Sequence, residues 1–588
     1  MLKCKNWLFL GPLLQLLLVL LIAVIGGQAE TVPCKLRDAQ YGKVCVCTSD
    51  YCDYLDNPTL SKDEEFALIS SSKKGLRFEV SKGNFGAKDK YIIKDYEEPK
   101  AETAARNVTI LSRLMDQTLG KIFSQTDSTT KPITRSVKLK LDRSKLYQRI
   151  EGFGGSFTGA VSYLVDNYKA QDIQDHLYKS YYAPNGLGFN LLRISIGGCD
   201  FDLAPWAYNE KPENETVLTG MDELDHRDVL RLAQIKRLKE VSGVKNLRIK
   251  GAAWSAPPWM KTNNRWTGFG RLKQQYYQTW ADYHLKWIDL MEKNDLPIWA
   301  ISTGNEPMNG ILFMVFVKFM SMGWTPQTQA IWVADNLGPT IRNSKYKDLF
   351  IFGNDDQRYT SPFWFKQVTL LVFPSGFQSP ITVSVQMNRT RPNSLQYIDG
   401  VALHWYWDEI FGNSFVHSTN EYMANKIQII SESCIGDKPW QKAAPLLGSW
   451  ERAEKYARSF ISHLQDGFHG WIDWNIILDE VGGPNYVNNT VDAPVVANTT
   501  SYTEFYKQPM FYIMGHFSKL VPEGSVHIEA VASNVNLDCV AFKRPDDKIV
   551  AVLFNSGRAD LNIDITDTIR GNLLVNVPAR SIHTILYN

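Results

Sequence analysis

From about residue 150 to residue 520, apolar strand-like segments alternate with amphipathic helical segments such as 272–292 and 449–463. Eight such alternations over about 370 residues are typical of a closed (β/α)8 TIM barrel with insertions, and they fit an open sheet less well. The class is therefore α/β, with the barrel at 150–520. The strands that we predict are 151–155, 189–196, 247–253, 298–303, 349–353, 400–405, 427–431 and 470–475.

Two regions that flank the predicted barrel show short strands and no long helical periodicity. The tail, 521–588, is too short to form a stable sandwich by itself, so we expect it to pair with strands from 54–149. This predicts a discontinuous all-β sandwich domain, 54–149 plus 521–588, attached to the barrel. The short strands that we predict in these regions are 76–80, 137–141, 549–554, 561–565 and 581–586.

The amino terminus resembles a secretory signal. Lys3 and Lys5 precede an apolar run that ends in small residues before Ala29, which predicts a signal peptide over 1–29. The run is also long enough for an uncleaved membrane anchor. Without Lys3 and Lys5, 62 basic and 62 acidic side chains remain, so the excess positive charge of a nucleic-acid binder is missing. Protonation of the 10 histidines near pH 5 would favour an anionic membrane surface.

Four cysteines crowd into a small predicted β segment, 30–53, directly after this signal. Because an exported chain meets an oxidising compartment, we expect two disulfides here rather than a zinc site. Three pairings of Cys34, Cys45, Cys47 and Cys52 are possible, and the residues alone do not choose among them. Candidate N-glycosylation sequons lie at Asn107, Asn214, Asn388, Asn488 and Asn498.

Polar and aromatic side chains collect where the predicted barrel strands end. Barrel enzymes place their chemistry at these carboxyl ends. Tryptophan rings there suit the apolar C–H faces of a sugar, and the polar groups suit its hydroxyls. The residues at these strand ends include Arg193, Asp200, Trp254, Asn305, Glu306, His404, Tyr406, Glu432 and Trp474.

Two of these residues, Glu306 and Glu432, follow the fourth and seventh strands, which stand nearly opposite in a barrel of this size. Hydrolysis of a glycosidic bond with retention needs two carboxyl groups about 5–5.5 Å apart, one acting as acid/base and one as nucleophile. We assign Glu306 as general acid/base, because Asn305 beside it can bond the sugar 2-hydroxyl. Glu432 is then the nucleophile, with Arg193 and Tyr406 keeping it charged and oriented.

The motifs around these residues resemble family 30 of the glycoside hydrolases, and more narrowly its lysosomal glucosylceramide-cleaving branch. Asn-Glu-Pro at 305–307, Ser-Glu-Ser-Cys at 431–434 and Asp-Trp-Asn at 473–475 carry the resemblance. It covers almost the whole chain after the predicted signal and includes the cysteine cluster. Each motif alone is moderately specific, whereas their order along the chain is highly specific.

This resemblance implies a retaining β-glucosidase that cleaves glucosylceramide to glucose and ceramide at acidic pH, with no metal or organic cofactor. Glu306 is then the proton donor, Glu432 the nucleophile, and the disulfides are Cys34–Cys45 and Cys47–Cys52. Asp200, Trp254, Asn305 and Trp474 are implied to hold the glucose ring, with Arg193 and Tyr406 supporting the carboxylates. The resemblance further implies a lumenal, membrane-peripheral lysosomal enzyme, with a saposin-type activator and a lysosomal delivery receptor as partners and no nucleic acid.

The chain departs from that branch in an apolar stretch, 308–322, after Pro307. This stretch is either a lip for ceramide chains or the bilayer, or a core helix that follows strand four. Two alternatives remain open: another family 30 activity on a glucan, a xylan or a steryl glucoside, and a catalytically silent lipid-binding barrel. An apolar lip favours a lipid aglycone over a soluble polymer, and the presence of both carboxylates argues against the silent barrel.

Overall fold

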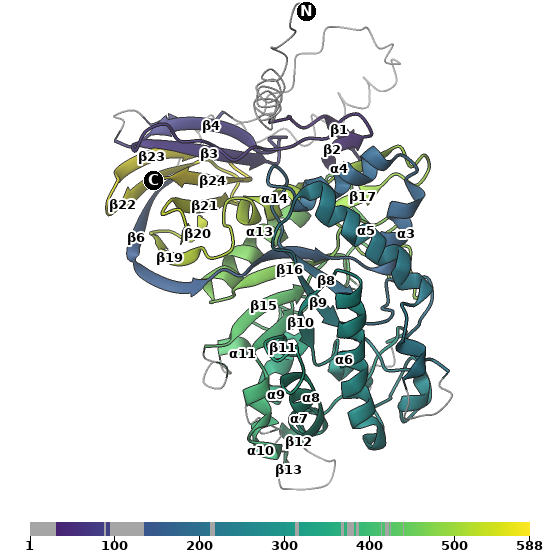
Figure 1. The fold of residues 1–588 in the computed structure, drawn as a ribbon. Helices are drawn as coiled ribbons and strands as arrows, with labels where there is room; N and C mark the ends of the chain where they lie inside the picture. Colours follow the sequence, from purple (N-terminus) through teal and green to yellow (C-terminus); the bar gives the residue numbers. More distant parts are fainter. Residues whose placement is uncertain are drawn as a thin grey trace, which may run out of the picture.

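The chain folds into a barrel and a β-rich domain that lie side by side (Figure 1). The computed structural model describes residues 31–86, 90–94, 135–211, 218–311, 317–365, 370–372, 381–383, 387–412, 414–417, 423, 425–438 and 440–588. The predicted signal peptide and the sequons at Asn107 and Asn214 lie outside these residues. Within the described part of the chain, no helix has the length and apolarity needed to cross a membrane.

Eight parallel strands close into a barrel, because the last of them, β16, pairs with the first, β7. This confirms the predicted (β/α)8 fold. The barrel strands are β7 Gly152–Ser156, β8 Leu191–Ser195, β9 Arg248–Ala252, β10 Ile298–Ser302, β11 Phe350–Gln357, β14 Gly400–His404, β15 Ile427–Glu432 and β16 Gly470–Asn475. A small two-stranded sheet, β12 Leu370–Val372 and β13 Ile381–Val383, follows β11.

Amphipathic helices cover the barrel. The prediction at 449–463 corresponds to α13, Trp450–Gln465, whose first turn is capped by Ser449 and whose apolar face is buried. The prediction at 272–292 corresponds to α6, Tyr277–Lys293. The other helices are α3 Gly159–Asn167, α4 Gln171–Tyr182, α5 His226–Ser242, α7 Pro326–Trp332, α8 Gly338–Arg342, α9 Ser361–Phe365, α10 Met387–Thr390, α11 Ser414–His417 and α14 Pro509–Ser518.

The β-rich domain is built around one ten-stranded sheet that interleaves both ends of the chain. Strand β24 pairs antiparallel with β3, and β22 pairs parallel with β6, so the tail pairs with strands that precede the barrel, as predicted. Helices α13 and α14 pack between this domain and the barrel (Figure 1). The sheet contains β3 Glu65–Ser72, β4 Glu79–Asn84, β5 Tyr91–Ile92, β6 Arg135–Arg149, β19 Val526–Ala532, β20 Asp538–Lys543, β21 Ile549–Asn555, β22 Leu561–Asp567, β23 Gly571–Val577 and β24 Ser581–Tyr587.

The predicted strand at 76–80 is wrong for most of its length. Residues 73–78 connect β3 to β4, and the chain reverses there through Gly75 and Phe78, whose φ angles are 140° and 55°. Leu76 belongs to this connection, and its apolar side chain is buried there although it is not part of a strand. Burial of a turn and burial of a strand leave the same local signal in a short segment.

The cysteine cluster lies on and beside strand β2 of a separate four-stranded sheet. It forms the disulfides Cys34–Cys45 and Cys47–Cys52, which confirms the pairing implied by the family resemblance. Two strands of this sheet come from the segment just before α14, because β18 pairs antiparallel with β2. The sheet contains β1 Leu36–Ala39, β2 Gly42–Thr48, β18 Glu504–Lys507 and β17 Val495–Ala497.

Candidate active site

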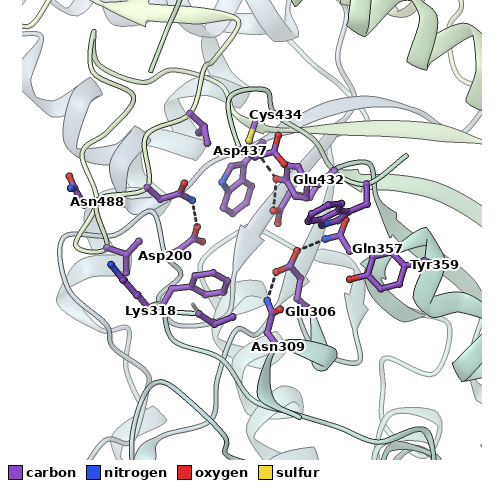
Figure 2. A pocket seen from close by; sticks show the side chains of 18 residues that line it. Asp200, Glu306, Asn309, Lys318, Gln357, Tyr359, Glu432, Cys434, Asp437 and Asn488 are labelled. Atoms are coloured by element: carbon purple, nitrogen blue, oxygen red, sulfur yellow. Dashed lines mark hydrogen bonds between the residues drawn. The ribbon is translucent and has the colours of Figure 1, made fainter. Parts of the chain in front are cut away.

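A cavity of about 530 Å³ opens at the carboxyl ends of the barrel strands. Of the predicted site residues, those on its wall are Asp200, Glu306, Tyr406, Glu432 and Trp474 (Figure 2). Arg193, Trp254 and Asn305 are buried and at most 4% exposed. Arg193 contacts Glu432 and Trp254 stacks on Trp474 from behind, while Asn305 accepts from Arg193. The structure thus brings all eight predicted side chains into one site, in two layers.

The two glutamates face one another across this cavity. Glu432 is the last residue of β15, and Glu306 lies four residues beyond the end of β10. Oxygen atoms of the two carboxylates lie within 4.8 Å of one another. Glu306 has a φ of 45°, an unfavourable conformation for a non-glycine residue, and its N–H donates to the Asp355 carbonyl at 2.9 Å. The fold therefore holds this backbone in a strained position that aims the side chain inward.

Two donors hold Glu432. The Arg193 guanidinium donates to one carboxylate oxygen, and the Tyr406 hydroxyl donates to the other at 2.7 Å. Arg193 also donates to the Asn305 side-chain oxygen at 2.7 Å, and its guanidinium lies 4.7 Å from the centre of the Trp254 ring. These contacts orient both carboxylate oxygens of Glu432, as positioning of a nucleophile requires.

A different set of donors surrounds Glu306. Gln357 Nε2 donates to Oε1 at 2.8 Å, and Asn309 Nδ2 donates to Oε2 at 2.5 Å. His404 Nδ1 lies 2.9 Å from Oε1 and 3.9 Å from a Glu432 oxygen. The two carboxylates therefore have separate first neighbours but share one imidazole.

Buried charges surround His404. Its Nε2 lies 3.4 Å from Asp355, which also accepts from Lys250 at 2.8 Å and Ser431 at 2.6 Å. Burial lowers the pKa of His404, but the charge of Glu432 and the contacts with Asp355 and Glu306 outweigh it and raise the pKa to about 10. His404 is therefore a cation at neutral pH.

The donor atoms of Glu306, His404 and Glu432 lie close enough together to suggest a metal site. Histidine binds metals as neutral imidazole. His404 carries a proton on each nitrogen in its charged form, so it donates to the carboxylates and has no lone pair for a metal. The chemistry of this donor set fits acid/base and nucleophilic catalysis better than metal binding.

Comparison with known proteins agrees with this geometry. The model of the glycosyl hydrolase family 30 TIM-barrel domain matches residues 150–521, and that of the family 30 beta sandwich domain matches residues 524–585. The chain belongs to glycosyl hydrolase family 30. It is accordingly a glycoside hydrolase, and the predicted family is confirmed.

Relatives within family 30 differ in activity. The chain is 32% identical to the lysosomal acid glucosylceramidase of Mus musculus over 562 residues, which cover 94% of this chain and 95% of that protein. It is 25% identical to endo-1,6-beta-D-glucanase BGN16.3 of Trichoderma harzianum, covering 77% and 87%. The crystal structure of SrfJ from Salmonella typhimurium shares the fold, with a TM-score of 0.69 and 19% identity over 89% of this chain and 99% of that one.

Asp200 lies on another part of the cavity wall, close to Glu432 and Glu306 in its electrostatic effects. Burial, followed by the charges of Glu432 and Glu306, raises the Asp200 pKa to about 8. Asp200 is therefore protonated at acidic pH and able to donate a hydrogen bond to a sugar hydroxyl. Trp474 lines the cavity nearby, and Trp254 stacks on it with ring centres 5.4 Å apart. Trp474 is thus the ring that faces the cavity, and Trp254 supports it.

Sequence reasoning missed the residues that β11 contributes. The predicted fifth strand ends at 353, whereas β11 continues to Gln357 and carries Asp355 and Gln357 into the site. The signal was present as the polar run Asn-Asp-Asp-Gln at 354–357, directly after an apolar strand. Asn309, which donates to Glu306, was also missed, because it lies within the largely apolar stretch 308–322.

The stretch 308–322 is described except for 312–316. Pro307–Gly310 forms a single 3-10 turn, and α7 begins only at Pro326, so the described part contains no core helix after strand four. Val317, Lys318 and Phe319 line the cavity, and Lys318 is exposed. These residues form part of the cavity mouth.

The three remaining sequons lie within the described residues. Asn488 is exposed on the cavity wall. Asn498 is half-buried, and its Nδ2 donates to Glu504 and Tyr506 at 3.1 and 2.9 Å. Asn388 lies in α10.

Replacement of His404 by glutamine should lower the free energy of unfolding by about 3 kcal/mol near pH 6, because it removes a buried cation from among three carboxylates. The raised pKa means that this contribution is fully present below the ordinary histidine pKa and is lost as pH rises through about 10. Denaturant unfolding of both proteins should therefore converge towards pH 10.

The matched control is His527→Gln. Burial lowers the His527 pKa to about 4, so this residue is neutral from pH 6 upwards. Its effect on unfolding should not change between pH 8 and pH 10, where His527 is neutral in both the folded and the unfolded state. A His404→Gln effect that is equally independent of pH would contradict the charged state assigned here.

Proposed function

We propose that this family 30 enzyme is a retaining β-glucosidase that hydrolyses glucosylceramide to glucose and ceramide in the acidic lysosome. One observation carries the mechanism: the oxygens of Glu306 and Glu432 lie within 4.8 Å of one another on the wall of one cavity. Such a spacing suits direct attack by a carboxylate, whereas inverting enzymes need about 6.5–9.5 Å to admit a water molecule.

In the first step, the Glu432 carboxylate attacks the anomeric carbon while Glu306 donates its proton to the leaving oxygen. The C1–O bond breaks, ceramide leaves, and a glucosyl ester forms on Glu432. In the second step, Glu306 takes a proton from water, the water oxygen attacks the same carbon, and Glu432 is released as a carboxylate. Retention follows from two inversions.

The contacts around the pair suit this exchange of charge. Arg193 and Tyr406 stabilise Glu432 before attack, when it carries the negative charge. After attack the charge resides on Glu306, which has given up its proton. His404 contacts Glu306 at 2.9 Å and lies near Glu432, so the same cation stabilises either state. Preorganised charge of this kind lowers the barrier because little reorganisation is needed.

The lipid substrate is supported by two findings. The relative named lysosomal acid glucosylceramidase aligns over 95% of its own length. The mouth of the cavity carries the apolar residues Val317 and Phe319, which suit an acyl chain better than a polysaccharide. An anionic membrane surface, a saposin-type activator and a lysosomal delivery receptor are part of this proposal.

The decisive experiment measures glucose release from glucosylceramide in anionic vesicles, beside a water-soluble aryl β-glucoside, β-1,6-glucan, xylan and a steryl glucoside. We expect hydrolysis of the lipid and the aryl glucoside, with no activity on the polymers. Preferential hydrolysis of β-1,6-glucan would favour the activity of the Trichoderma relative instead. Vesicle binding without turnover of any substrate would indicate a silent lipid-binding barrel.

Activity on the aryl glucoside should reach its maximum at acidic pH. Glu306 must be protonated in the first step, and Asp200, with a pKa of about 8, donates to substrate only in its protonated form. Initial rates measured across the pH range check this expectation, and a maximum above pH 8 would contradict it.

A further inference from the structure

The sequon Asn488-Asn489-Thr490 lies on the wall of the catalytic cavity. Asn488 is exposed and lines this cavity with Val487 and Lys318. Its φ is 60°, in the left-handed region that asparagine tolerates better than most residues. Figure 2 shows Asn488 on the side of Asp200 and Lys318, away from Gln357 and Tyr359. A group attached to Asn488 would therefore stand at one end of the substrate site.

The loop that carries this sequon is well anchored. The Asn485 side-chain oxygen accepts from the N–H groups of Val487 and Asn489 at 3.2 and 2.9 Å. The Tyr486 hydroxyl accepts from the Met320 N–H at 2.9 Å, which ties the loop to the segment that carries Lys318. Asn489 Nδ2 lies 3.4 Å from Asp200. The position of Asn488 relative to Asp200 is thereby fixed.

The Asn488 amide is open to modification. Among the residues that the structure describes, none hydrogen-bonds its side chain, whereas Nδ2 of Asn498 donates twice within the fold. In N-glycosylation, Nδ2 loses a proton and bonds to the sugar C1 as the C1–O bond to a lipid-pyrophosphate donor breaks. The product is a bulky, hydrated oligosaccharide. At Asn488 it would project from the cavity rim.

The catalytic assignments indicate which end of the cavity takes the aglycone and which end takes the glucose. Glu306, as the acid, must lie beside the leaving oxygen, so the aglycone lies towards Glu306 and its neighbours Asn309 and Gln357. The glucose ring then extends from the anomeric carbon towards Asp200. Asn488, on the Asp200 side, flanks the far end of that glucose, where a longer sugar chain would continue.

We propose that an N-glycan on Asn488 closes this end of the site and confines the enzyme to single terminal glucosyl residues. Substrates whose sugar continues beyond that glucose collide with the glycan, while the aglycone side stays open to lipid. The inference rests on the proposed function, because it uses the assigned roles of Glu306 and Asp200, and on passage of the chain through the secretory pathway. It concerns a different property, the selection of substrates by the length of their sugar chain.

The experiment compares Thr490→Ala, which destroys the sequon but keeps Asn488, with Thr490→Ser, which keeps the sequon. Both are secreted from a glycosylating host, and mass spectrometry of the Asn488 peptide reports occupancy. We expect kcat/KM for an aryl β-gentiobioside, cleaved to release intact gentiobiose, to rise about tenfold in Thr490→Ala. The aryl β-glucoside should change less than about twofold, and Thr490→Ser should match the parent.

A second readout does not depend on turnover. In a Glu432→Gln background, calorimetry should show tighter binding of gentiobiose, but not of glucose, when Thr490→Ala removes the glycan. An unmodified Asn488, or equal gentiobiose affinity with and without the glycan, would overturn the inference. Failure of the parent to hydrolyse the aryl glucoside would instead overturn the proposed function, and the binding comparison would still decide the role of the glycan.

Discussion

Glu432→Gln should lower kcat for an aryl β-glucoside on the order of 10⁴-fold or more, as removal of a covalent nucleophile does in other enzymes. Glutamine has the same shape but cannot form the glucosyl ester. Its amide oxygen still accepts one of the two hydrogen bonds that Arg193 and Tyr406 make to the carboxylate. Steady-state kinetics measure the loss of kcat, and thermal unfolding of the same preparation checks that the fold is kept.

The matched control is Glu240→Gln, on the exposed side of α5, whose side chain is 72% exposed. This change should leave kcat unaltered. Glu432→Gln that retains more than a tenth of the parent activity while unfolding normally would refute the nucleophile assignment. If the inactive variant also fails to fold, the parent protein is instead labelled with an activated 2-fluoro-glucoside. The label should attach to Glu432 and to no other carboxylate.

The effect of Glu306→Ala on activity should depend strongly on the leaving group of the substrate. For substrates with poor leaving groups, such as glucosylceramide, loss of the general acid should cost about 10²–10⁴-fold in kcat/KM. For activated aryl glucosides the first step needs no proton, so formation of the glucosyl ester should be slowed far less. The second step then lacks its base, and the ester should accumulate. Kinetics across a series of aryl leaving groups measure this dependence.

Added azide provides the confirming test for Glu306→Ala. Azide needs no base, so it should attack the accumulated ester in the space left by the carboxylate and restore turnover of activated substrates as β-glucosyl azide. Glu432→Gln should show no such β-product, because it forms no ester. Equal damage to activated and unactivated substrates, without azide rescue, would argue against Glu306 as acid/base.

Local patterns in the chain were sufficient to predict the barrel and to choose the carboxylates. Most barrel strands contain a short apolar run, and Glu306 and Glu432 lie at or beyond the carboxyl ends of two of them, so their shared edge follows from parallel closure alone. The strand at 76–80 failed because a buried turn and a buried strand look alike over five residues. The predicted fifth strand is too short because polar residues such as those at 354–357 are typical of a loop, whereas here they belong to β11.

Contacts between distant segments were not readable in this way. Asp355 contacts Lys250 from β9, Ser431 from β15 and His404 from β14. No local sequence pattern predicts that these three strands place side chains beside the same carboxylate. The pairing of β18 with β2 is of the same kind, because it joins segments more than 400 residues apart. Such contacts depend on register, and a shift by one residue would turn every side chain to the other face.

The sequence by itself thus determined the architecture, the family and the identity of the two carboxylates, because periodicity and motif order are properties of neighbouring residues. Only the tertiary structure decided how far apart those carboxylates stand, which charges surround His404, and that Asn488 lies at the rim of their cavity. These are distances between chain segments, and they are set by barrel closure and strand register rather than by any stretch of residues alone.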